Sequence, residues 1–119
     1  MRQVGKFFRV TMLWILLLPV ASTLLGVASN QAVLIANHDR FPVMMNDSVM
    51  ALEDVDANGM LDHEHCVMTD QTHLNALADI FDVHDAWISV GDMFIRLGDW
   101  LMAFCPFVWL ALVIRRLYV

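Results

Sequence analysis

The chain has 119 residues, 59% of them hydrophobic, and its mean hydropathy is +0.59. Soluble globular domains are usually about 45–50% apolar, and a chain of this length has room for one domain at most. Acidic residues outnumber basic residues by 13 to 7. This balance excludes the basic footprint of a nucleic-acid-binding protein, so we predict no nucleic-acid partner. The high apolar content predicts a small membrane protein.

Charges of opposite sign are separated along the sequence. All 13 acidic residues lie between Asp39 and Asp99. Five of the seven basic residues flank this acidic region and the apolar stretches beside it: Arg2, Lys6, Arg9, Arg115 and Arg116. Because basic residues beside a membrane span are retained in the cytoplasm, we predict cytoplasmic termini and an acidic loop outside. The predicted segments are a cytoplasmic N-terminus (1–9), helix 10–36, loop domain 37–88, helix 89–114 and a cytoplasmic C-terminus (115–119).

The first apolar stretch, residues 10–36, contains no charged residue. About 20 residues cross the hydrocarbon core of a bilayer, so this stretch is long enough for a tilted transmembrane helix. A cleaved signal peptide is the alternative, because the start is basic and small residues occur at positions 27–29.

The loop region, residues 37–88, contains three local signals. The Phe41-Pro42-Val43 run predicts extended chain, because a residue before proline avoids the helical region. Polar residues at 46–48 predict the cap of a short helix that ends near Glu53. Residues 69–81 predict a second short helix, since apolar side chains recur at helical spacing: Leu74, Leu77, Ala78 and Phe81. The expected fold is therefore an all-α membrane protein, two transmembrane helices joined by an acidic extracytoplasmic loop domain with short helices.

The second transmembrane helix is predicted to begin at Ser89, an N-cap residue with Asp92 in the first helical turn. Its uncharged part, residues 100–114, rises only about 22 Å. The span therefore includes the preceding turns, which places Arg96 and Asp99 at the outer membrane boundary. Spacings of three and four residues predict interfacial ion pairs of Asp92 and Asp99 with Arg96. A functional charge within the membrane is the alternative.

Residues 54–62 match the first part of a calcium-binding loop, in which oxygen ligands alternate along the chain before a glycine turn. The predicted ligands of this calcium site are the side chains of Asp54, Asp56, Asn58 and Asp62 and the carbonyl group of Met60. The acid that closes such a loop is replaced by His65. The alternative is an acidic turn that binds no ion, because Asp, Asn and Gly are common turn residues.

A second group of possible metal ligands, suited to zinc or copper, consists of His63, Glu64, His65 and Cys66, with His73 further along. Histidines that face solvent or cap local structure are the alternative. We expect no disulfide between Cys66 and Cys105, because one lies in the loop and the other in a transmembrane stretch. No serine lies in a catalytic motif and no phosphate-binding glycine loop is present, so we predict that the protein is not an enzyme.

Several residues, in order, match a known pattern: Gly26, Asn30, Val33, Ile35, Asn37, Arg40, Pro42, Val43, His65, Met68, Thr69, Thr72, Leu74, Leu77, Asp79, Ser89, Gly91, Asp92 and Gly98. Over about residues 25–98 the chain resembles the uncharacterised bacterial membrane family called domain of unknown function fifty-three seventeen. The family carries two glycines after Asn37, where this chain has His38 and Asp39, and the resemblance covers none of the family's usual upstream membrane segments. It implies a membrane-anchored fold in the bacterial inner membrane. It also implies a polar, hydrogen-bonded cap where the loop meets the helices: Asn37, His65, Thr72, Asp79, Ser89 and Asp92.

The leading functional hypothesis is a small non-enzymatic accessory subunit in the lipid bilayer, packed through its helices against other membrane proteins or copies of itself. Small residues along the helices permit close contact: Gly5, Ala21, Ser22, Gly26, Gly98 and Ala103. Two alternatives belong to other classes. One is an extracytoplasmic module that binds a divalent cation at residues 54–62. The other is a small two-span, holin-like pore protein of phage origin.

Overall fold

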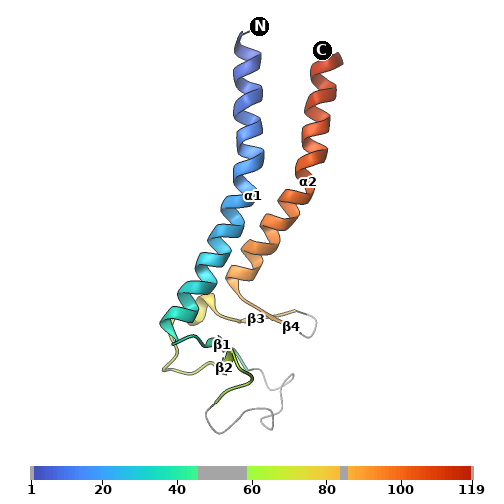
Figure 1. Ribbon diagram of the computed structural model, residues 1–119. Coiled ribbons are helices and arrows are strands. Elements are labelled where there is room, and N and C mark those ends of the chain that lie inside the picture. The colour runs from blue at the N-terminus through green and yellow to red at the C-terminus, as the bar shows by residue number, and fades with distance from the viewer. Residues whose placement is uncertain (1, 46–58, 84–85, 119) are drawn as a thin grey trace.

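The computed structural model describes residues 2–45, 59–83 and 86–118. Two long helices, α1 (Arg2–Ala36) and α2 (Val90–Tyr118), run antiparallel and form a hairpin. Figure 1 shows the ends of the chain together at one end of this hairpin and the strands at the other. The molecule is correspondingly long, with extents of 69 × 27 × 19 Å.

Both helices are long and apolar enough to cross a membrane, over Arg9–Ala36 and Val90–Arg115. Of the most apolar part of each helix, only 11% is buried in α1 and 6% in α2. A core helix of a soluble protein would be mostly covered by its own chain. These helices instead turn large apolar side chains outward, from residue 10 in α1 and from residue 93 in α2, which is the arrangement that lipid stabilises. The predicted two-helix architecture is confirmed at this level.

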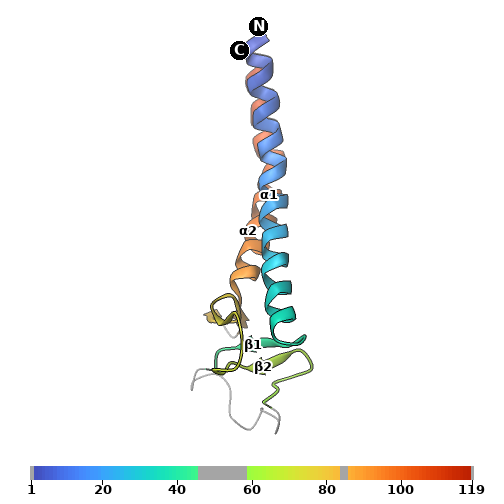
Figure 2. The same ribbon diagram turned by 90° about the vertical axis from the view of Figure 1, so that its left-hand side faces the viewer.

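The chain between the helices forms a small module of short strands (Figure 2). Strands β1 (Phe41–Val43) and β2 (His65–Val67) pair in parallel, with Phe41 opposite His65. Strands β3 (Phe81–Val83) and β4 (Ala86–Ile88) form an antiparallel pair. The extended conformation predicted at Phe41–Val43 is confirmed, and all three of these residues are buried.

The module is joined to α1 by a small apolar core. Val33 of α1, Phe41 of β1 and Ala78 are buried together. Leu34, Met68 and Leu77 pack around these three residues and remain partly exposed. The last turns of α1 therefore belong to the module as much as to the helix hairpin.

The short helix predicted over residues 69–81 is wrong. This segment contains turns, a single 3₁₀ turn η2 (Asn75–Leu77) and then β3. Leu74 has a left-handed backbone with φ of 56°, which no helix continues. Asp79 pairs with β1: its N–H donates to the Pro42 carbonyl at 3.2 Å, and its own carbonyl accepts from the Met44 N–H at 2.9 Å. The other short helix, predicted to begin at residues 46–48, lies outside the described residues.

Candidate functional site at the junction of helices and module

Close backbone packing brings α1 and α2 together near the module. A Cβ atom on Gly26 would collide with the Gly91 carbonyl oxygen, and a Cβ on Gly91 would lie 2.7 Å from the Gly26 carbonyl oxygen. Two turns further along, a Cβ on Gly98 would lie 2.9 Å from the carbonyl oxygen of Pro19, which is itself fully buried. Glycine is therefore required at these positions for the helices to approach so closely.

Hydrogen bonds across this contact fix the start of α2. The Ser89 hydroxyl accepts from the Asp92 N–H at 3.0 Å, and the Asp92 carboxylate accepts from the Ser89 N–H at 3.0 Å. This reciprocal pair is a capping box, so the N-cap predicted at Ser89 is confirmed. Asn30 of α1 completes the network: its amide donates to Asp92 at 2.8 Å and its carbonyl oxygen accepts from the Ser89 hydroxyl at 2.9 Å.

Asn37 makes the corresponding connection at the end of α1. Its buried side chain donates to the carbonyl oxygens of Val33, at 2.9 Å, and His73, at 2.8 Å. It also accepts a hydrogen bond of 2.8 Å from the His73 N–H. This one amide therefore ends the helix and holds a segment that follows it by 36 residues. His38 and Asp39, which come next, have φ values of 57° and 62°, so the chain turns in the left-handed region that glycine favours.

Asp79 is the buried carboxyl group of the module. It is 6% exposed, and its Oδ1 atom has no hydrogen-bond partner among the described residues. Burial, and to a smaller extent the negative charge of Asp92, raises the pKa of Asp79 to about 6 against the opposing effect of His65. A carboxyl group in this setting prefers to keep its proton at mildly acidic pH.

We define the junction as Asn30, Asn37, Asp79, Ser89 and Asp92, which lie where the helices meet the module. Of the six residues predicted to form a polar cap, four belong to it. Thr72 instead stabilises a local turn, accepting from the Thr69 N–H at 3.0 Å and donating to Asn75 at 2.8 Å. His65 binds Asp62, and its ring lies edge-on to Phe41.

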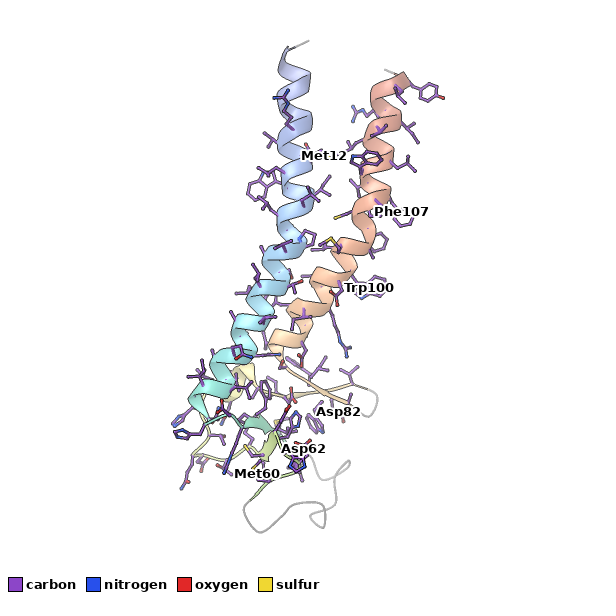
Figure 3. The ribbon with its side chains drawn as sticks, viewed as in Figure 1. Met12, Met60, Asp62, Asp82, Trp100 and Phe107 are labelled. Atoms are coloured by element: carbon purple, nitrogen blue, oxygen red, sulfur yellow. The ribbon has the colours of Figure 1, made fainter. Side chains whose placement is uncertain are left out.

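The described part of the predicted calcium loop is held by its own hydrogen bonds. Asp62 accepts from the N–H groups of Glu64, at 2.8 Å, and His65, at 2.7 Å, and its carboxylate lies 2.8 Å from the His65 ring. These backbone and ring bonds lower the pKa of Asp62 to about 2. Figure 3 shows Asp62 and Met60 at the end of the module away from the helices. The other predicted ligands, Asp54, Asp56 and Asn58, lie outside the described residues.

The second set of predicted metal ligands is not brought together. No group of three or more His, Cys, Asp or Glu side chains in the described ranges is placed to hold a metal ion. His63, Glu64 and His73 are exposed. Cys66 is a free, buried thiol on β2, and burial raises its pKa. Cys105 is also free, and its thiol donates to the Ile15 carbonyl of α1 at 3.1 Å.

The charged residues of α2 do not pair as their spacing suggests. Asp92 is bound to Ser89 and Asn30, and Arg96 and Asp99 are exposed on the helix surface. Among the described residues, the ion pair between Asp62 and His65 is the only one. A surface hollow of about 240 Å³ lies beside Arg96, between the first turns of α2 and β4.

The predicted cap omits three parts of this region: Asn30, Gly91 and the His73 backbone. A signal for Asn30 exists, because it is one of few polar residues at the end of an apolar helix nearest the module. The His73 contact carries no such signal, since it is made by main-chain atoms.

The fold and the junction define a helix-hairpin protein that could cross a membrane and that carries a small strand module at one end. The chain belongs to the family described as "Family of unknown function (DUF5317)", whose profile it matches over residues 8–104. The resemblance to this family is therefore confirmed. Comparisons with curated proteins and with solved structures gave no match.

Eight of the positions that carry the family resemblance lie at the helix contact or the junction. Gly26, Gly91 and Gly98 are the glycines of close approach. The junction residues Asn30, Asn37, Asp79, Ser89 and Asp92 are all in the same pattern. The left-handed turn at His38 and Asp39 forms without glycine. These shared positions therefore lie where the two helices contact each other and the module.

Proposed function

We propose that this protein is a small non-enzymatic subunit of a membrane complex. In this proposal its two helices span the bacterial inner membrane, both termini are cytoplasmic and the acidic module lies outside. The basic residues near both ends and the acidic residues between the helices support this orientation. The hairpin supports it as well, because both ends of the chain lie at the same end of the molecule (Figure 1).

The observation that carries this proposal is the difference between the inner and the outer faces of the hairpin. The inner faces are closed by glycine contacts and by hydrogen bonds such as that from the Ser22 hydroxyl to the Phe94 carbonyl, at 2.8 Å. The outer faces carry large exposed apolar side chains, from residue 10 to 35 in α1 and from residue 93 to 118 in α2. A hairpin closed inside and apolar outside is suited to lateral packing in a membrane, with the module held in a fixed position above it.

The same features favour this role over the two alternatives. A pore needs a polar path, whereas the two helices are in close backbone contact at Gly26, Gly91 and Gly98. For a cation-binding module, the best-placed described carboxylate, Asp62, is already bound to two N–H groups and a histidine ring.

Extraction of the tagged chain from its native membrane in mild detergent tests the proposal. Native sizing followed by mass spectrometry should find the chain in a defined complex with other membrane proteins. The Gly91→Leu variant, which prevents the helix contact, should be lost from that complex, and Ala28→Leu, on an exposed face, should remain. A chain recovered without other proteins, as a monomer or only with copies of itself, would overturn the accessory role.

A further inference from the structure

The face of α2 turned away from α1 has a regular pattern of its own. Gly91, Gly98 and Cys105 contact α1 and are seven residues apart. On the opposite side, alternate spacings of four and three residues connect a second row: Arg96, Trp100, Ala103, Phe107, Leu110 and Ile114. All six are exposed, and Figure 3 shows Trp100 and Phe107 pointing away from α1. This is the spacing by which one helix packs along another. We call this row, with Asp99 beside it, the outer seam.

In the proposed membrane-spanning arrangement, the outer seam places charges at a depth where lipid does not stabilise them. Asp99 lies 16 positions before Arg115, which corresponds to about 24 Å of helix. The hydrocarbon core of a bilayer is about 30 Å thick. If the basic residues mark the inner boundary, Asp99 is inside the apolar layer and Arg96 is near its outer edge. No described residue forms an ion pair with either of them.

The charges of the seam are complementary to a second copy of the same seam. Each chain offers one cation, Arg96, and one anion, Asp99, less than one helical turn apart. Under a two-fold axis parallel to the helices, each Arg96 meets Asp99 of the second copy, and the contact is made twice. The small residue Ala103 and a hollow of about 230 Å³, lined by Arg96, Asp99, Trp100 and Ala103, leave room for a side chain of that copy.

From this charge pattern and spacing we infer that the protein forms a parallel homodimer through the outer seam of α2, with reciprocal Arg96–Asp99 ion pairs between copies. This dimer rests on the proposed function, because it requires both helices to span the membrane. It adds that one partner of the chain is a second copy of itself. A different partner protein would need its own matching pair of charges, whereas a second copy supplies this pair by symmetry.

Charge exchange between two tagged versions of the full chain tests this inference. The Arg96→Asp variant carries two acids in the seam, and the Asp99→Arg variant carries two bases. Each is co-expressed with a differently tagged copy of itself, or with the other variant, and purified in mild detergent through one tag. Recovery of the second tag should fall at least tenfold for each variant alone relative to the original chain. The mixed pair should recover it, because the mixed seam again joins opposite charges.

A second variant keeps the test decisive if charge reversal impairs membrane insertion. Ala103→Trp fills the hollow with an apolar group and should abolish co-purification, while Ala28→Trp, on α1, should leave it unchanged. If the original chain does not co-purify with itself, or if the single charge variants co-purify as well as the mixed pair, the inference is overturned. Self-association without other proteins would support this inference and contradict the accessory role, so the two proposals fail separately.

Discussion

The amide of Asn30, near the end of α1, donates a 2.8 Å hydrogen bond to the carboxylate of Asp92, in the first turn of α2. The same Asn30 side chain accepts from the Ser89 hydroxyl, so one residue of α1 contacts both members of the capping box of α2. The start of α2 is therefore positioned by α1.

Replacement of Asn30 by leucine should loosen the start of α2. The Ser89 hydroxyl and the Asp92 carboxylate would each lose a partly buried partner, which typically costs about 1–3 kcal/mol. Hydrogen exchange of the Asp92 amide, which is bonded to Ser89, should become faster by at least tenfold. Gln31→Leu is the matched control, because Gln31 is the exposed neighbour and should leave the exchange rate unchanged.

Replacement of Gly91 by alanine should separate the helices. The added Cβ would collide with the Asn30 side chain and lie 2.7 Å from the Gly26 carbonyl oxygen, so backbone must move. Overpacking of this kind costs about 1–3 kcal/mol. The midpoint of thermal unfolding in detergent, followed by circular dichroism, should fall by several degrees. A midpoint equal to that of Ala28→Leu, where the added group enters open surface, would contradict the observed contact.

Asp79 makes the stability of the module depend on pH. Its pKa of about 6 in the folded state is above the ordinary value of 3.8, so the folded protein binds the proton more tightly than the unfolded chain does. Stability should therefore fall as the pH rises from about 4 to 6 and change little with this group above that range. The full effect is about 2–3 kcal/mol at a rate of 1.36 kcal/mol per pKa unit.

The Asp79→Asn variant should remove this dependence and be more stable than the original chain at pH 7.5. Urea unfolding of both proteins at pH 4.5, 6 and 7.5 measures the difference directly. Asp82→Asn, at an exposed position of β3, is the control and should keep the original pH profile. An Asp79→Asn profile that still falls between pH 4 and 6 would show that another group titrates there.

Glycine at position 38 or 39 should stabilise the turn after α1. His38 and Asp39 both have positive φ values, and a side chain in this region costs about 1–2 kcal/mol per residue. Glycine removes that strain but also increases the entropy of the unfolded chain, so we expect a net gain of about 0.5–1 kcal/mol for each substitution. Denaturant unfolding of His38→Gly and Asp39→Gly tests this. Asp39→Val should lower the free energy of unfolding, because a β-branched side chain is least tolerated in this backbone conformation.

The two helices can be predicted from the sequence and the module cannot, for a physical reason. A transmembrane helix satisfies its own backbone hydrogen bonds, so an apolar run such as residues 10–36 is sufficient to predict it. The segment 69–81 has helical spacing too, but its backbone is paired elsewhere. Asp79 bonds to Pro42 and Met44, more than 30 positions earlier, and no local pattern reports such a contact.

The junction was partly predictable for a related reason. Ser89 and Asp92 form a local capping box, whose spacing of three can be read in any sequence. Asn37 and Asp79 belong to no such local pattern, and only the family resemblance indicates them. The role of Asn30 depends on the angle at which two helices cross, and that angle depends on Gly26 and Gly91 together.

The parallel pairing of β1 with β2 has a consequence for the length of the chain between them. Because both strands are held side by side, the connection from Met44 to Gly59 starts and finishes next to the same three-residue ladder. The entropy lost on closing such a loop grows only with the logarithm of its length, about 0.6 kcal/mol for each doubling. Insertions between positions 45 and 59 should therefore cost little free energy and leave the helix hairpin intact.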